Sequence, residues 1–281
     1  GGIEVEPIRV THSIPDSTAL ALFTPAGTVV HSGDFKIDPN PVDGQPTDLE
    51  RFAALGRQGV ALLLSDSTNA ELSGSAGSES DVLPAIETVL RESAGRVFFT
   101  LFASNVYRVA MIVRAAKAAG RRVALCGRSV EKHVDVARSL ALLDMPSDVL
   151  VPLDVAARLP RTEVVILIAG SQGERNSALG RLAAGDFGRI ELSEGDTVAF
   201  SARFIPGNEG AIYKVLNALV ERGAIVRYRM TDPMLHVSGH AHQDDQKRLI
   251  EAVRPRAFVP IHGPHQHMRC PAQTARAAGV G

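Results

Sequence analysis

The alternation of helical and strand-like segments from residue 81 onward restricts the fold of this chain more than any other feature. Apolar residues recur at three- and four-residue steps over Asp81–Ser93 and Asn105–Ala119, which predicts helices. Short aliphatic runs such as Val164–Ala169 and Thr197–Ser201 lie between helices and predict buried strands. Because strands that alternate with helices usually form parallel sheets, this region predicts an α/β domain with a mainly parallel sheet.

The N-terminal residues have a different pattern. Two β-rich runs at 19–23 and 28–31 flank Pro25-Ala26-Gly27, which predicts a hairpin. A short helix is expected at 49–55, and the aliphatic run Val60–Leu64 predicts a buried strand that ends at Ser65-Asp66. The Gly- and Ser-rich stretch from 73 to 80 then predicts a connector between domains.

After residue 230 the chain is expected to return to the first domain. The segment Gln243–Val253 has helical apolar spacing, and Ala257–Ile261 predicts a further strand. We therefore predict two segments of one domain, residues 1–72 and 231–281, with an α/β domain inserted between them at 73–230.

Composition bounds the class of protein. With 281 residues, 45% of them hydrophobic, the chain can bury a full core, and a net charge of −1 excludes a global basic field for nucleic acid. Two cysteines without CxxC spacing fit a reducing cytoplasm. No apolar run approaches the ~20 residues that span a bilayer, so no membrane partner is expected. The start Gly1-Gly2-Ile3 lacks the basic and apolar regions of a signal peptide, and the absence of an initiator methionine suggests a fragment.

Histidines cluster near the C-terminal end. Three lie within His236–His242, around a Ser-Gly break that precedes the predicted helix, and His262 ends a predicted strand just before a glycine. A lone histidine is more often a satisfied core or surface residue than a metal ligand. Here, His12 and Asp34 also lie just past predicted strand ends, so the four loops together predict one site assembled from distant sequence.

Strand-to-helix turns of the middle region carry small polar residues. Ser104 and Asn105 follow one strand, Gly170–Glu174 follows a second and Ser201–Glu209 a third. Each turn has an ordinary explanation, since Ser and Asn cap helices. Free N–H groups at such turns also bind phosphate, and the carboxyl ends of strands in open α/β sheets commonly hold ligands. A shared cleft is therefore expected, with capping as the alternative use of each residue.

Eight short motifs, in order along nearly the whole chain, resemble the ribonuclease J family of β-CASP nucleases. They are Thr-His-Ser-Ile-Pro-Asp-Ser at 11–17, Gly-Asp-Phe-Lys at 33–36, Ser-Asp-Ser-Thr-Asn at 65–69, Phe-Ala-Ser-Asn at 102–105, Gly-Ser-Gln-Gly-Glu at 170–174, Ile-Pro-Gly-Asn-Glu at 205–209, His-Val-Ser-Gly-His at 236–240 and Pro-Ile-His-Gly at 260–263. The resemblance implies a partial metallo-β-lactamase αββα sandwich with an inserted β-CASP α/β domain.

The resemblance also implies a zinc-dependent ribonuclease. Two zinc ions would activate water for attack on RNA phosphodiesters, a role that suits carboxylate and imidazole ligands. By similarity to the family, His12, Asp34 and His262 are expected to bind metal. Asp66 and His240 are expected to be the catalytic pair, with the histidine protonating the leaving oxygen.

The substrate expected from the resemblance is single-stranded RNA, preferably with a 5′-monophosphate. The predicted activity is 5′-to-3′ exonuclease action, with endonuclease action as well, in cytoplasmic RNA processing and decay, and the full-length protein is expected to be a homo-oligomer. The substrate-binding residues predicted on this basis are Ser104, Asn105, Arg203, His236, Ser238 and Gly239.

Three departures from the family pattern qualify this expectation. The signature His-x-His-x-Asp-His, which supplies further metal ligands, is absent from these 281 residues, so the chain alone is expected to have an incomplete metal site and little or no activity. Pro264 stands where the family usually has Glu, followed by His265 and His267, which we interpret as surface histidines without a metal role. Ala202 replaces a serine.

Two other functions stay open from the sequence. One is a β-CASP nuclease that acts on DNA, although the Ser-Gly-His and Phe-Ala-Ser-Asn motifs favour RNA. The other is a non-catalytic paralogue that binds RNA or assists assembly, which the missing signature supports. The presence of all five expected metal and catalytic residues argues against such decay.

Overall fold

A computed structural model of the chain describes residues 2–142, 145–263 and 265–280. The chain divides into two compact units. Unit 1 comprises Gly1–Ser80 and Val237–Gly281, and unit 2 is the continuous segment Asp81–His236. Among the described residues, no helix is long and apolar enough to cross a membrane.

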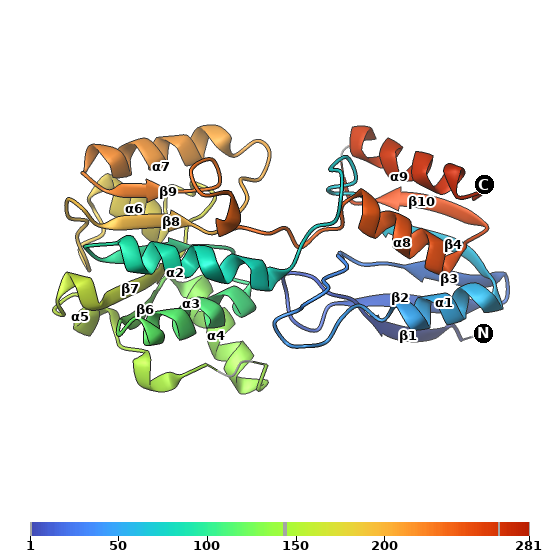
Figure 1. Ribbon diagram of the computed structural model, residues 1–281, viewed down its shortest axis with the longest axis horizontal. Coiled ribbons are helices and arrows are strands. Elements are labelled where there is room, and N and C mark those ends of the chain that lie inside the picture. The colour runs from blue at the N-terminus through green and yellow to red at the C-terminus, as the bar shows by residue number, and fades with distance from the viewer. Residues whose placement is uncertain (1, 143–144, 264, 281) are drawn as a thin grey trace. The chain divides into compact units, whose positions relative to one another are not determined.

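Unit 1 is built on a five-stranded mixed sheet in the order β1-β2-β3-β4-β10 (Figure 1). The first three strands form the predicted antiparallel hairpin and its extension, whereas β4 pairs in parallel with both β3 and β10. The strands are β1 (Glu4–Arg9), β2 (Thr18–Thr24), β3 (Gly27–His31), β4 (Val60–Asp66) and β10 (Ala257–Ile261). Because β3, β4 and β10 run the same way, their carboxyl ends meet at one edge of the sheet.

One face of this sheet packs against helices. Helix α1 (Leu49–Gln58) contacts α8 (Gln243–Val253), which in turn contacts α9 (His265–Ala277). Buried side chains of α1 and α8 form a core with inward-facing residues of the sheet such as Ala21 and Leu63. The strand period of two directs Leu20 to the opposite face, where it is 37% exposed. The described part of unit 1 thus contains one layer of helices on one sheet.

Unit 2 is the α/β domain that the sequence predicts. All its strand pairs are parallel, in the order β6-β7-β5-β8-β9, and every residue of β7 is buried. The strands are β5 (Val97–Thr100), β6 (Arg122–Cys126), β7 (Val164–Ile168), β8 (Thr197–Phe200) and β9 (Ile225–Arg227). Burial on both faces explains why these strands read as continuous aliphatic runs.

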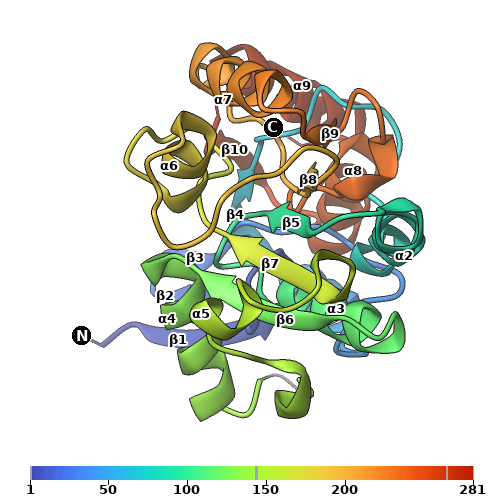
Figure 2. The same cartoon turned by 90° about the vertical axis from the view of Figure 1, so that its left-hand side faces the viewer.

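Helices cover both faces of this sheet. The helices are α2 (Leu83–Glu92), α3 (Val106–Ala118), α4 (Arg128–Ser139), α5 (Leu153–Ala156), α6 (Ala178–Ala184) and α7 (Glu209–Glu221). In Figure 2, α2 and α6 lie on opposite sides of the strands. Phe98, Ile166 and Val198 share one core cluster with residues of α5, α6 and α7, while α2 packs on α3. The predicted α/β fold with a mainly parallel sheet is confirmed.

The two segments that leave and re-enter unit 1 are hydrogen-bonded to each other. The Gln243 and Asp244 amides donate to the Leu72 and Gly74 carbonyls, each over 3.0 Å. The Asp245 carboxylate accepts from the Ala76 amide at 2.9 Å and also from the His242 amide, which caps α8. The outgoing and returning chains are therefore fastened side by side on unit 1.

A buried ion pair holds the outgoing segment from its other side. Lys36 is 1% exposed and Asp38 2% exposed, and their Nζ and Oδ2 atoms lie 3.0 Å apart. The ammonium also donates to the Gly77 carbonyl, and the carboxylate accepts from the Glu79 amide. Asp34 belongs to the same loop, so the loop that carries this aspartate is fixed to the connector.

Candidate metal centre

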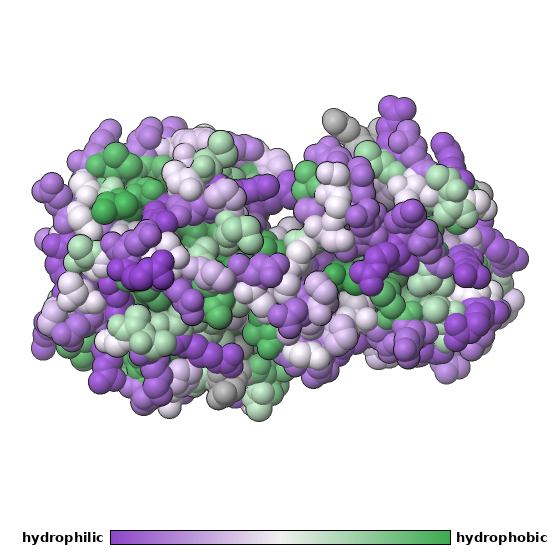
Figure 3. Space-filling model, in the orientation of Figure 1, coloured by the Kyte–Doolittle hydropathy of each residue, from purple (hydrophilic) through white to green (hydrophobic). Residues whose placement is uncertain are grey.

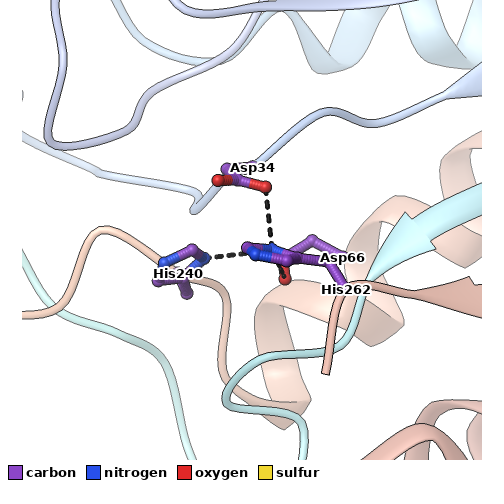
Figure 4. Close-up of side chains that lie close together, drawn as sticks. All are labelled: Asp34, Asp66, His240 and His262. Carbon is purple, nitrogen blue, oxygen red and sulfur yellow. Dashed lines mark hydrogen bonds and ion pairs between the residues drawn. The ribbon is translucent and has the colours of Figure 1, made fainter. Parts of the chain in front are cut away.

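Four side chains converge at the edge where the parallel strands of unit 1 end (Figure 4). The ligand atoms of Asp34, Asp66, His240 and His262 all lie within 4.8 Å of one another. Asp34 follows β3, Asp66 ends β4 and His262 follows β10, while His240 lies in the loop before α8. Three strand ends and one helix-preceding loop thus bring together residues from four distant parts of the sequence.

Asp66 is the buried centre of this group. Its side chain is 1% exposed, and its Oδ2 lies 2.8 Å from His240 Nδ1. Its Oδ1 accepts from the Thr68 amide at 2.9 Å and from the Thr68 hydroxyl at 2.6 Å. Burial acts to raise the pKa of this carboxyl, but the bond and charge of His240 and the Thr68 donors lower it overall. Asp66 is therefore an ionised acceptor that directs Nδ1–H of His240 toward itself.

His262 occupies a strained backbone position. Its φ of +55° is rare for a residue with a side chain, and such strain is common at functional sites. The Ser67 hydroxyl and amide, which donate to the Ile261 carbonyl at 2.6 and 2.9 Å, hold the chain in place. His262 Nδ1 lies 3.0 Å from Asp34 Oδ1 and 3.4 Å from Asp66 Oδ1. The imidazole thus faces both carboxylates.

His12 lies beside the group but is not one of the four. Its Nδ1–H donates to the Gly239 carbonyl at 2.7 Å, and its ring meets that of His240 edge-on at 4.9 Å. Burial lowers the pKa of His12, which favours the neutral imidazole despite the Gly239 bond. A Cβ on Gly239 would lie 2.8 Å from His12 Nδ1, so this contact requires glycine. His12 therefore holds the loop that carries His240, and its role as a metal ligand stays a prediction.

The predicted substrate-binding residues fall in both units. In unit 1, the Ser238 hydroxyl accepts from Asn69 Nδ2 at 2.7 Å and from the His240 amide at 3.1 Å. Ser238 and Gly239 thus shape the His240 loop. The contact between Asn69 and Ser238, which are 169 positions apart, was not predicted from the sequence.

In unit 2, Asn105 caps α3 by accepting from the Arg108 amide at 3.1 Å, which is the alternative use noted for it. Arg108 is 1% exposed, and its guanidinium donates to the Ser201 carbonyl at 3.0 Å and lies 2.9 Å from His236 Nδ1. The sequence did not single out Arg108. Ser104 and Arg203 lie in loops after β5 and β8.

His267 is more closely bound than the sequence suggested. Interpreted above as a surface histidine, it has a side chain only 16% exposed; its Nδ1–H donates to the Thr68 carbonyl at 2.9 Å, and its Nε2 lies 3.2 Å from the Glu71 carboxylate. It therefore fastens α9 to the turn that holds Asp66. Pro264 and the side chain of His265 lie outside the described residues.

The four-residue group fits a zinc site. Two carboxylates and two imidazoles are ligand types that zinc accepts, and Asp66 is already ionised. Such carboxylate–imidazole pairs orient metal ligands and raise their basicity. The arrangement can hold a cation and position one imidazole, His240, by a buried carboxylate.

Replacing Thr68 by valine is expected to weaken metal binding by roughly 10- to 100-fold, because this removes a hydroxyl that donates to Asp66 and lies 3.2 Å from His262 Nδ1. Thr68→Ser keeps the hydroxyl and is the matched control. Zinc titration of both variants by calorimetry measures the effect. Equal affinities for the two would show that the Thr68 hydroxyl does not orient the ligands.

Two family sequence models match the chain. That of the "Ribonuclease J, beta-CASP domain" matches residues 94–219, within unit 2. That of the "Zn-dependent metallo-hydrolase RNA specificity domain" matches residues 224–281, which include His240 and His262.

Curated relatives match along nearly the whole chain. Ribonuclease J of Helicobacter pylori (strain J99 / ATCC 700824) is 45% identical over 280 residues, which are 100% of this chain and 40% of that protein. Ribonuclease J of Synechocystis is 45% identical over 98% of this chain and 43% of its own length. That of Mycobacterium tuberculosis (strain ATCC 25618 / H37Rv) is 43% identical over 100% of this chain and 50% of its own length. The chain spans half or less of each.

The fold has a counterpart among solved structures. A protein of unknown function from Enterococcus faecalis V583 superposes with a TM-score of 0.63, covering 94% of this chain and 59% of that one. At 19% identity this similarity concerns the fold alone. The two sequence models and the relatives at 43 to 45% identity show that the chain belongs to the ribonuclease J family.

Proposed function

We propose that this chain is part of a metal-dependent ribonuclease that processes and degrades RNA, acting from the 5′ end and also internally. The convergence of Asp34, Asp66, His240 and His262 carries the proposal, because it supplies both ligands for a cation and an imidazole positioned by a buried carboxylate. Relatives that match 98 to 100% of the chain are named Ribonuclease J, which supports RNA over DNA as the substrate.

Asp34 and His262 are the proposed metal ligands, with His12 as a third, in a site that holds two zinc ions when complete. Zinc would supply Lewis-acid polarisation of a phosphodiester and of the attacking water. Asp34 is 44% exposed and His262 53% exposed, so both side chains are accessible to an ion from solvent.

Asp66 and His240 are the proposed catalytic pair. With Nδ1–H directed to the ionised carboxylate of Asp66, the Nε2 atom of His240 is left to donate a proton to the leaving oxygen. The Asp66 carboxylate fixes the orientation of the His240 ring through this bond. His12 supports this geometry by fixing the Gly239 carbonyl next to His240.

The proposed substrate contacts rest on the chemical groups that the loops carry. Ser238 and Gly239 adjoin His240, and hydroxyls and amides of such loops bind phosphate. In unit 2, Arg203 supplies a cation in the loop after β8; the remaining residues proposed to bind substrate are Ser104, Asn105 and His236. A 5′-terminal monophosphate held by such groups would favour exonuclease action. We further propose a homo-oligomer in the cytoplasm.

The domain assignment is also proposed. Residues 1–72 and 231–281 would be segments of a metallo-β-lactamase domain, and 73–230 a β-CASP domain inserted between them. The single helix layer on the sheet of unit 1 supports a partial sandwich.

The test compares the 281-residue chain with a longer protein that contains this sequence. Zinc content and hydrolysis of a 5′-monophosphorylated single-stranded RNA are measured for both, before and after dialysis against a chelator. We expect the longer protein to hold about two zinc ions and to release nucleotides from the 5′ end, to lose activity on dialysis and to regain it with zinc. If the longer protein binds RNA but neither binds zinc nor cleaves RNA, the chain belongs to a non-catalytic RNA-binding protein. If it cleaves DNA of the same sequence in preference to the RNA, the chain belongs to a DNA nuclease.

A further inference from the structure

Three aromatic side chains, of Phe204, Tyr213 and Tyr228, form a cluster in unit 2, and none of the three has been assigned a role so far. The rings of Phe204 and Tyr228 are parallel, with an interplanar angle of 4° and centroids 6.0 Å apart. Tyr213 meets Phe204 edge-on at 6.1 Å, and Phe204 meets the buried Phe200 edge-on at 6.2 Å. Phe204 and Tyr228 also pack against the core of unit 2, so this aromatic cluster is anchored.

The aromatic cluster lies at the carboxyl end of the parallel sheet. Phe204 is in the loop after β8, Tyr228 directly follows β9, and Tyr213 is in the second turn of α7. Gln172 fixes the first loop, since its side chain donates to the Arg203 carbonyl and accepts from the Ile205 amide, each over 2.9 Å. Open α/β sheets bind ligands at this end. The position suits a rigid binding surface.

The aromatic cluster is open to solvent on one side. Tyr213 is 45% exposed, as is Ile205, which follows Phe204 in the sequence, and Met230, two residues after Tyr228, is 77% exposed. On the face drawn in Figure 3, hydrophilic residues predominate and hydrophobic ones form small separate patches. The chain has no tryptophan and only three tyrosines, yet two of the three are in this cluster.

Each ring has a basic residue beside it in the sequence. The pairs are Arg203-Phe204, Tyr213-Lys214 and Tyr228-Arg229, and Lys214 and Arg229 are exposed. Two carboxylates lie in the same segments: Glu209 accepts from the Gly207 amide at 2.7 Å, and Asp232 forms an ion pair with Arg227. The exposed side chains that directly follow Tyr213 and Tyr228 are both cationic.

We infer that this aromatic cluster is a stacking platform for bases of single-stranded RNA, with Tyr213 as its outermost ring. The inference rests on the proposed function for its choice of RNA. Rigid aromatic faces with adjacent cations are the combination by which single-stranded nucleic acid is bound without sequence preference, because every base has a π-face and every phosphate a charge. A protein partner would need no cation beside each ring. Tyr228 and Arg229 also lie within the residues matched by the RNA specificity domain model.

The test measures binding without cleavage, in the presence of a chelator, on the longest protein that carries this chain. A short single-stranded RNA and an abasic oligonucleotide of equal length and charge are titrated, with fluorescence anisotropy of a labelled end as the signal. Tyr213→Leu is expected to weaken binding of the RNA roughly 5- to 100-fold, the loss of one stacked base, and to leave binding of the abasic strand unchanged. Tyr213→Phe should bind the RNA like the unchanged protein.

Val220→Ala is the matched control, since Val220 is 57% exposed on the same helix. Tyrosine emission gives a second readout that needs no variant, because stacked bases should quench it whereas the abasic strand should not. Unchanged affinity of Tyr213→Leu for the RNA, an equal loss for the abasic strand, or a shift in sedimentation of Tyr213→Leu without a change in RNA binding would each overturn the inference.

Failure of the proposed function gives a different result. If binding depends on the bases and on Tyr213 but no RNA is cleaved when zinc is restored, the stacking platform stands and the ribonuclease proposal fails. If RNA is cleaved with the same KM by the unchanged protein and by Tyr213→Leu, the ribonuclease proposal stands and the stacking platform fails.

Discussion

Replacing His240 by alanine is expected to slow RNA hydrolysis by about 10²- to 10⁴-fold while zinc content stays nearly unchanged. The reason is geometric: His240 is held through Nδ1 by the buried Asp66 carboxylate, so the proposed role of its Nε2 is proton donation. Asp34 and His262 remain in place to hold the cation. Metal content by mass spectrometry and initial rates on a 5′-monophosphorylated RNA measure the two effects in the longest protein that carries the chain.

Two further histidine variants calibrate this result. His262→Ala should lower metal content and rate together, because His262 is a proposed ligand. His133→Ala should change neither, since His133 lies exposed on α4 and its Nδ1 donates to the Ser129 carbonyl of the same helix. If His240→Ala removes metal as completely as His262→Ala does, His240 is a ligand and not the proton donor.

Replacing Lys36 by methionine is expected to lower the free energy of unfolding of unit 1 by about 3 to 5 kcal/mol. The change leaves Asp38, which is 2% exposed, without its cation at 3.0 Å. Burial acts to raise the pKa of Asp38, but the charge of Lys36 and the bonds from Glu79, Ser78 and Asn40 lower it overall. Urea unfolding at neutral pH measures the loss, and Lys247→Met, on the exposed face of α8, is the control.

The same pair predicts a pH dependence. Because the folded-state pKa of Asp38 lies below its unfolded value, the stability it contributes is present above the unfolded pKa and is lost as the pH falls through the folded pKa. Adding Asp38→Asn to Lys36→Met removes the uncompensated charge and should recover part of the loss at neutral pH. A Lys36→Met protein as stable as Lys247→Met would show that this pair contributes little to unit 1.

The sequence predicted the sheet of unit 2 and the strand-end positions of Asp34, Asp66 and His262, because both follow from local patterns of apolar residues. It did not predict helix α9, whose pattern is interrupted by Pro271 inside the helix.

The contacts that complete the site were beyond prediction for a different reason. Thr68 to His262, Asn69 to Ser238 and His12 to Gly239 join residues 169 to 227 positions apart, and no local pattern records such pairs. The expectation that His267 lies on the surface was wrong for the same reason, since its partners Thr68 and Glu71 lie about two hundred residues earlier in the chain.

The hydrogen bonds between the segments around Leu72 and Gln243 make unit 2 easy to exchange by genetic recombination. Because the outgoing and returning segments are bonded to each other through Gly74, Ala76 and Asp245, unit 2 (Asp81–His236) is an insertion whose two ends are tied together on unit 1. Such a segment can be exchanged for that of a homologue, or a short linker can replace it, without rethreading the host sheet. One crossover at each end of unit 2 would therefore exchange the inserted domain during evolution and keep Asp34, Asp66, His240 and His262.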